Sequence, residues 1–220
     1  MSIGNIDPYY SRHEVSNSDL TKLKMYFANA DFVRDATAAY RFGNLVDAMI
    51  TEKERCDFYS LKVDGEQFYQ EEWDKALRMR DAFFKDEECA TLMKLSAPQH
   101  FMTEESGRIS YSGIEFEIPR RCKWDLWMPK MGWGADIKST FATSQKQFEA
   151  ACRHFDYPRS RAWYMDIAGS DKDMMIGISK ENYKIFKIRI KRGDAMYQEG
   201  LEQYQELAFR WWTLFGNLTL

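Results

Sequence analysis

The sequence lacks the features that define several common protein classes. No run of 18 apolar residues occurs in its 220 residues, so we predict no membrane-spanning helix. Segment 1–8 has neither a basic nor an apolar stretch, so we expect no signal peptide. No CxxC pair occurs, which argues against a structural zinc site and favours free thiols in a reducing cytoplasm. The four scattered cysteines are Cys56, Cys89, Cys122 and Cys152. An iron–sulfur cluster could use them, but the usual grouped spacing is missing.

Two common catalytic motifs are also missing, and the charge balance is nearly even. No GxSxG or GxxxxGK[ST] sequence occurs, which excludes the usual serine hydrolases and P-loop proteins. The formal net charge of −3 gives no overall attraction to nucleic acid. Any contact with DNA would therefore need a local basic surface.

The composition is that of a globular protein, with 45% hydrophobic and 30% charged residues. The length suits one domain with a substantial core. We predict a single domain over residues 1–220, in which 1–98 is mainly helical and 99–220 holds a sheet and a C-terminal helix. No internal repeat or linker is apparent.

Apolar residues at three- and four-residue steps predict helices in the first part. Ser16 or Ser18 is the expected N-cap of the first helix. A second helix begins near Ala36 and contains Gly43, which suggests that backbone or a bulky group packs close by. One or two further helices are expected between Glu71 and Leu95.

The second part predicts a sheet. Strands are expected at 99–103, 108–111, 114–118, 120–127, 133–139, 174–179 and 185–191. Helices are expected over 141–154 and from Arg159, and segment 162–168 either continues that helix or forms a strand. Asp194 should cap a last helix that extends to Phe215. This order predicts an α/β (α+β) fold with a central mixed sheet flanked by helices.

Two acids and a lysine stand out in the hairpin expected between 123 and 138. Asp136 and Lys138 are two positions apart, so they share one face of a strand, and the hairpin would bring Asp125 beside them. Two carboxylates and an ammonium on one face are costly unless a divalent cation lies between the acids. An Asp-Ile-Lys triplet alone is more often a surface ion pair. The additional acid favours a metal-dependent phosphodiesterase site.

This pattern resembles the PD-(D/E)xK nuclease superfamily, and more specifically the RecB-like and RecE-like exonucleases carried by phages. The likeness covers about residues 15 to 168, with the motifs in the family's order. The matching segments are Val15–Leu20, Phe42–Ile50, Glu105, Arg121–Asp125, Asp136–Lys138 and Tyr157–Tyr164. The resemblance implies a restriction-endonuclease-like core that hydrolyses DNA phosphodiester bonds.

The resemblance also implies a metal site with one or two Mg²⁺ or Mn²⁺ ions. Asp125 and Asp136 would be the principal ligands, together with the Ile137 carbonyl. Asp47 stands where these exonucleases often have a histidine ligand, and its carboxylate is itself a suitable donor.

The resemblance assigns catalytic roles to a lysine and a further acid. Lys138 would orient or deprotonate the attacking water and stabilise the scissile phosphate. Glu105 is the expected additional acid, and three other glutamates compete for that role: Glu104, Glu115 and Glu117.

Basic side chains are expected to contact DNA phosphates. One group, Lys187, Arg189 and Lys191, alternates along a predicted strand. Such a pattern is about as often a plain solvated face as a phosphate-binding one. The other group flanks Ser160, which stands where the family has a glutamine and is itself expected to contact DNA. The basic residues are Arg159, Arg161, Lys187, Arg189 and Lys191.

We therefore expect a DNA exonuclease acting on double-stranded ends in the cytoplasm of a bacterial or phage-infected cell. A homo-oligomer and a single-strand annealing protein stay open as partners. The departures at Asp47 and Ser160 leave a catalytically weakened DNA-binding protein as an alternative, and an endonuclease of the same fold is another.

Overall fold

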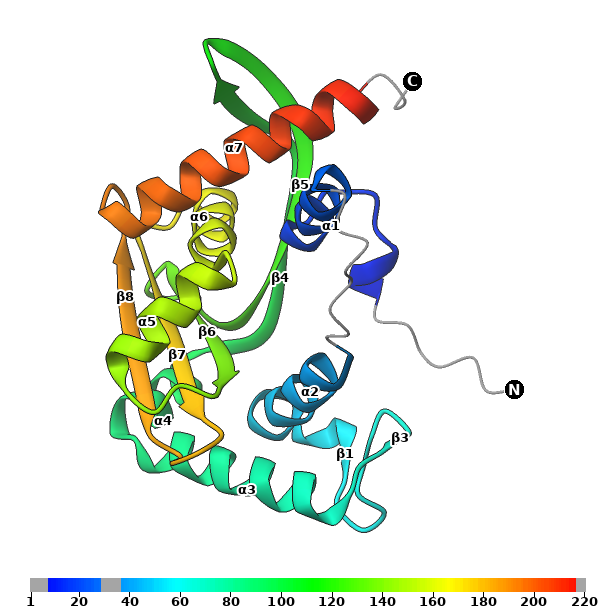
Figure 1. Ribbon diagram of the computed structural model, residues 1–220, viewed down its shortest axis with the longest axis vertical. Coiled ribbons are helices and arrows are strands. Elements are labelled where there is room, and N and C mark those ends of the chain that lie inside the picture. The colour runs from blue at the N-terminus through cyan, green and yellow to red at the C-terminus, as the bar shows by residue number, and fades with distance from the viewer. Residues whose placement is uncertain (1–7, 29–36, 217–220) are drawn as a thin grey trace.

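A five-stranded mixed sheet forms the centre of the structure, a computed structural model that describes residues 8–28 and 37–216 (Figure 1). Its strands lie in chain order: β4 (Ala97–Tyr111), β5 (Ile114–Met128), β6 (Trp133–Thr140), β7 (Lys172–Ser179) and β8 (Ile185–Lys191). Only β6 and β7 are parallel, and the other neighbours are antiparallel. A parallel pair needs a long crossover, which here contains two helices, α5 (Gln145–His154) and α6 (Tyr157–Ala168). The predicted fold class is confirmed.

Helices cover both faces of this sheet. One apolar cluster joins it to α5, α6, α1 (Asn17–Phe27) and α7 (Ala195–Phe215). The other joins it to α2 (Thr37–Thr51), α3 (Gln70–Lys85) and α4 (Glu87–Leu95). In Figure 1, α7 lies across α6, on the side of the molecule opposite α3. None of the helices in the described part of the chain is long and apolar enough to cross a membrane.

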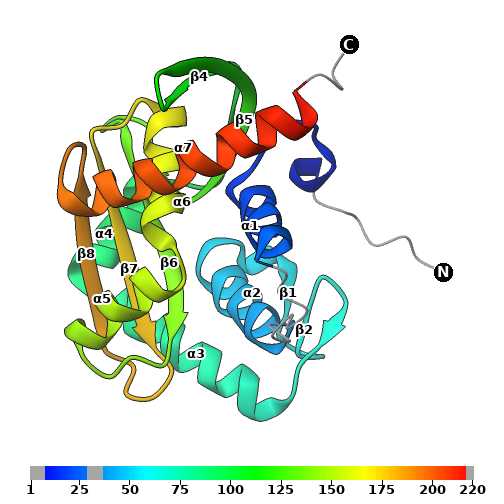
Figure 2. The same ribbon diagram turned by 45° about the horizontal axis from the view of Figure 1, so that its top comes forward.

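The remaining elements are short. Two 3₁₀ turns lie at Pro8–Ser11 and Lys53–Arg55. A small antiparallel sheet between α2 and α3 consists of β1 (Cys56–Asp57), β2 (Lys62–Val63) and β3 (Glu66–Gln67). Figure 2 shows this sheet beside α2.

The predicted strand breaks within 99–111 and 114–127 are wrong, because β4 and β5 each run through them. The β4–β5 register shifts between Glu104 and Gly107. Pro119 lies opposite that shift, where the ladder needs no hydrogen bond from it, so a proline is tolerated inside the strand. Segment 162–168 continues the helix. Ser16 and Asp194 are N-caps, as predicted.

The strands β5 and β6 separate at the two aspartates of interest. Their pairing covers Leu126↔Ala135 and the two pairs nearer the turn. Asp125 and Asp136 are the next residues beyond the last pair. There the backbone N–H of Ile137 donates to Asp125 Oδ2 at 2.7 Å. We call this place the β5–β6 fork, defined by Asp125, Asp136, Ile137 and Lys138.

Two glycines beside the β5–β6 fork differ in the space around them. A Cβ atom on Gly134 would lie 2.1 Å from a ring carbon of Trp124, so β6 can approach that ring only because the residue is glycine. A Cβ on Gly43 would meet only Ser139 Oγ, at 3.9 Å. The expectation of a tightly packed neighbour at Gly43 is therefore wrong.

This difference predicts opposite effects on stability. Gly134→Ala should lower the free energy of unfolding by about 1–3 kcal/mol, because the core around Trp124 becomes overpacked. Gly43→Ala should raise it by up to about 1 kcal/mol, because alanine favours a helix interior. Urea denaturation of both variants beside the parent protein measures the two changes. Equal effects would contradict the packing described here.

Candidate active site

Four charged side chains meet at the β5–β6 fork. Asp125 comes from β5, Asp136 and Lys138 come from β6, and Asp47 comes from α2. Burial, followed by the charges of Asp136 and Asp47, raises the pKa of the Asp125 carboxyl well above its ordinary value. Asp47, Asp136 and Lys138 thus all act electrostatically on Asp125, while the metal site expected from these residues stays a prediction.

The Asp136 carboxylate lies between two cations. Its Oδ2 pairs with Lys138 Nζ, and its Oδ1 lies 2.6 Å from Arg161 Nη1. Burial alone would raise the pKa of Asp136, but Lys138 and Arg161 outweigh it and lower that pKa. Burial likewise opposes the charge on Lys138, but Asp136 and Asp125 raise the pKa of its ammonium. Both groups of this pair are therefore ionised.

Arg161 lies inside the protein, so the prediction that it contacts DNA is wrong. Its side chain is fully buried, and Nε lies 3.0 Å from Asp173 Oδ2. The guanidinium also lies 4.2 Å from the ring centroid of Tyr164 and 5.0 Å from that of Trp124. Arg161 thus joins α6 to carboxylates of β6 and β7. Asp173 was not among the predicted site residues, and its only signal in the sequence is an acid at the start of an apolar strand.

Asp47 is half-buried and anchored by polar neighbours. Gln99 Nε2 donates to Asp47 Oδ2 at 2.9 Å and also contacts Thr51 Oγ1 at 3.0 Å. Burial is the main cause that raises the pKa of Asp47 to about 6, while Lys138 opposes the shift. Gln99 adopts a positive φ of 52° and interrupts the β4–β5 ladder. The sequence analysis gave Gln99 no role in the site.

Glu105 is not brought to the β5–β6 fork. It is exposed at the irregular part of β4, six residues from Gln99 and so about 20 Å away along the strand. Its alternatives lie in the same distal part of the hairpin. Glu104 pairs with Arg120, and Glu115 and Glu117 are near the turn. The expected fourth acid is therefore not provided by these residues.

The basic face of β8 is largely neutralised. Lys187 Nζ lies 2.5 Å from Asp86 Oδ1 and 3.0 Å from Glu88 Oε2. Arg189 Nη2 lies 2.7 Å from Glu88 Oε1, whereas Lys191 is exposed. Moreover, β7 separates β8 from β6. Lys187 is therefore engaged by two acids of the protein, whereas phosphate contacts by the 61% exposed Arg189 and by Lys191 stay predictions, since exposed ion pairs are weak.

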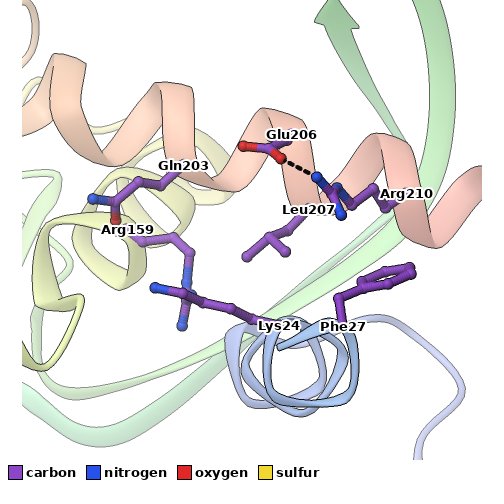
Figure 3. A pocket seen from close by; sticks show the side chains of 7 residues that line it. All are labelled: Lys24, Phe27, Arg159, Gln203, Glu206, Leu207 and Arg210. Carbon is purple, nitrogen blue, oxygen red and sulfur yellow. Dashed lines mark hydrogen bonds and ion pairs between the residues drawn. The ribbon is translucent and has the colours of Figure 1, made fainter. Parts of the chain in front are cut away.

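Arg159 anchors α6 to α1, whereas Ser160 makes a hydrogen bond within α6 and its contact with DNA stays a prediction. The Arg159 side chain is 2% exposed, and its Nε donates to Asn17 Oδ1 at 2.9 Å. Ser160 Oγ donates to the carbonyl of Tyr157 at 2.9 Å. Arg159 lines a cavity of about 210 Å³ between α1, α6 and α7 (Figure 3). The other lining residues are Lys24, Phe27, Gln203, Glu206, Leu207 and Arg210. The predicted surface contact of Arg159 with DNA is wrong, because its guanidinium is buried.

The oxygen donors at the β5–β6 fork are of the kind that Mg²⁺ and Mn²⁺ prefer. Burial, and then the neighbouring charges of Asp136 and Asp47, raise the pKa of Asp125, and a bound cation would oppose both effects. Within the described ranges, however, no three His, Cys, Asp or Glu side chains are arranged to hold a metal ion. The chemistry of the donors fits a metal, while Asp136 is paired with Lys138 and Arg161.

A family model matches residues 21–215, and its description is "PDDEXK-like domain of unknown function (DUF3799)". The match covers most of the chain, so the protein belongs to this family and thereby to the PD-(D/E)xK nuclease superfamily. No curated protein matches the chain.

Matches among solved structures include two of low identity. The phage-related exonuclease from Haemophilus somnus 129PT is 13% identical, with 97% of this chain and 100% of that chain covered, at a TM-score of 0.43. The crystal structure of SSO0001 is 8% identical, with 88% of this chain and 67% of that chain covered, at a TM-score of 0.40.

The raised pKa of Asp47 predicts a pH-dependent stability. Folding favours the protonated carboxyl, so stability should fall as the pH rises from the ordinary carboxyl range through about 6. Asp47→Asn should remove that cost and raise the free energy of unfolding at pH 8 by about 1–3 kcal/mol, and by less at pH 5. Urea denaturation in EDTA at pH 5 and pH 8 measures the free energy of unfolding of the variant and the parent protein.

The matched control is Asp81→Asn, the same chemical change at an exposed position on α3. It should shift stability little at either pH. If Asp47→Asn behaved like this control, the Asp47 carboxyl would not experience the burial described above.

Proposed function

We propose that this protein is a divalent-metal-dependent deoxyribonuclease that degrades double-stranded DNA from its ends, for phage-type recombination or repair. The observation that carries the proposal is the convergence of Asp47, Asp125, Asp136 and Lys138 at the β5–β6 fork. Membership of the nuclease superfamily supports the reaction class. A homo-oligomer and an annealing partner stay predictions.

The proposed roles follow from the donors at the β5–β6 fork. Asp47, Asp125, Asp136 and the Ile137 carbonyl would hold Mg²⁺ or Mn²⁺. When bound, such an ion supplies an activated water and neutralises charge on the phosphate. Arg161 fixes the position of the Asp136 carboxylate from the opposite side.

Lys138 would contact the scissile phosphate. Because neighbouring carboxylates raise the pKa of its ammonium, it keeps its proton near neutral pH. A charged ammonium can donate hydrogen bonds to a phosphate oxygen or orient a water, but it cannot accept a proton from that water. Of the two roles expected from the sequence, the charge on Lys138 supports orientation and electrostatic stabilisation.

Cleavage assays test this proposal. The substrates are linear, nicked and covalently closed circular DNA with Mg²⁺, and EDTA should stop all cleavage. Lys138→Met should reduce degradation of linear DNA by about 100-fold or more, as expected for loss of a charge that stabilises the reacting phosphate. Lys130→Met, at an exposed position in the same hairpin, serves as the matched control and should retain activity.

The substrates separate the competing functions. Degradation of linear DNA that spares closed circles supports an exonuclease. Cutting of closed circles would instead indicate an endonuclease of the same fold. Loss of activity in both lysine variants would mean that Lys138 has no specific role.

A second candidate is a catalytically weakened DNA-binding protein. It is favoured by the two cations on Asp136, since Lys138 and Arg161 compete with a metal for the same carboxylate oxygens. DNA binding without metal-dependent cleavage by the parent protein would support it.

This competition predicts an effect on metal affinity. Lys138→Met should tighten Mn²⁺ binding by about tenfold, because one Coulombic competitor for Asp136 is removed. Asp125→Asn should weaken binding. Electron paramagnetic resonance of free Mn²⁺ during titration measures both. Unchanged affinity in Lys138→Met would show that the Lys138–Asp136 pair does not limit metal binding.

A further inference from the structure

A lysine enclosed by two aromatic rings lies beside the β5–β6 fork. Lys180 follows β7, and its Nζ lies 4.7 Å from the ring centroids of both Phe42 and Phe141. Its backbone N–H donates to the carbonyl of Thr140 at 2.7 Å. This bond joins Lys180 to the end of β6, two residues after Lys138.

The charge of Lys180 is not balanced by an acid. The residue is 8% exposed, and within 8–28 and 37–216 its ammonium forms no ion pair with a carboxylate. Burial, followed by repulsion from Lys75, lowers the pKa of this ammonium. Its stabilising contacts are the faces of the two rings, which attract a cation. An uncompensated positive charge therefore remains next to the candidate active site.

Phe141 combines this buried contact with a large exposed surface. Its side chain is 69% exposed, although one part of the ring faces Lys180. Phe141 lies three positions after Lys138 in the chain, so the two Cα atoms are at most about 10 Å apart. Successive nucleotides of a DNA strand are about 3.4 Å apart, so the distance from Lys138 to Phe141 corresponds to roughly three nucleotides.

Two other exposed phenylalanines also contact a cation, Phe101 with Arg12 and Phe27 with Arg210, but both of these cations are partly exposed. Phe84 on α3 is 43% exposed, and its ring makes an edge-on contact with Phe83. Scattered exposed apolar residues of this kind are ordinary. Phe141 differs because the cation that contacts its ring, Lys180, is itself buried.

We propose that Phe141 stacks on one unpaired base of the DNA strand within about three nucleotides of the scissile phosphodiester, and that Lys180 provides positive charge for the neighbouring phosphate. Aromatic stacking is tolerant of sequence, because every base has a π face. This inference rests on the proposed nuclease function and specifies its substrate class: DNA with at least one unpaired nucleotide at the end that is cut.

The probe is a short single-stranded oligonucleotide that carries 2-aminopurine, whose fluorescence falls when it stacks. Binding is measured in EDTA, so that cleavage does not interfere. The parent protein should bind the oligonucleotide and quench 2-aminopurine at a position near the end. Phe141→Ala should weaken binding by about tenfold, the loss of one base–aromatic stack, and abolish the quenching.

Three further variants separate stacking from a structural effect. Phe141→Trp keeps an aromatic ring and should restore the quenching. Lys180→Met keeps the length of the side chain but removes its charge, so it should weaken binding and reduce the salt dependence. Phe84→Ala is the matched control and should behave like the parent protein. Thermal unfolding of each variant identifies any loss of the fold.

The outcomes distinguish this inference from the proposed function. Parent-like binding and quenching by a folded Phe141→Ala would overturn the stacking contact, even if the parent protein cleaves DNA. Loss of quenching in Phe141→Ala and its return in Phe141→Trp would support the contact, even if no cleavage occurs. Failure of the parent protein to bind the oligonucleotide would overturn this inference, whereas the proposed function is decided separately by the cleavage assays with Mg²⁺.

Discussion

The buried arrangement of Arg161 between Asp136 and Asp173 is the interaction on which the site depends. It connects α6, β6 and β7, and the apolar core surrounds it. Charges removed from water are tolerated only when each has a close partner, and loss of one partner typically costs about 3–5 kcal/mol. The position of the Asp136 carboxylate is therefore set by the interior of the protein, and the solvent-facing side of the β5–β6 fork can vary without displacing it.

The separation of β5 and β6 explains how two helices from opposite faces of the sheet reach one site. A continuous ladder would place backbone between Asp47 on α2 and the charges that α6 supports. Because the pairing ends at Leu126↔Ala135, side chains from both layers act on Asp125. The hydrogen bond from Ile137 to Asp125 replaces part of the lost ladder. The interruption of the sheet thus creates the site, at the cost of only a few backbone hydrogen bonds.

Local patterns predicted where the central sheet lies, the caps at Ser16 and Asp194 and the triplet on β6, because residue spacing determines which face a side chain takes. They did not predict the small sheet β1–β3 or the continuity of β4 and β5. Charge pairing over long sequence separations was not predictable. Arg161 resembles a surface cation until Asp173 is placed beside it, and Lys187 resembles a phosphate contact until the acids of α4 pair with it. Glu105 was wrongly predicted for a related reason. The strand β4 is 15 residues long and continuous, so it places Glu105 far from the β5–β6 fork. Burial and ion pairing depend on the assembled fold, which one sequence does not specify directly.

The crossover between β6 and β7 also determines when the site can exist during folding. The ion pair of Asp136 can form only after α6 has brought Arg161 into place. The second ion pair of Arg161 needs Asp173 on β7. These residues lie on either side of a connection that must close before the parallel strands can pair, and such non-local contacts form late. Until then the carboxylate is hydrated and the arginine has no counterion. A chain whose synthesis has reached only the end of α6 would therefore contain the Asp-Ile-Lys triplet without the geometry that positions it.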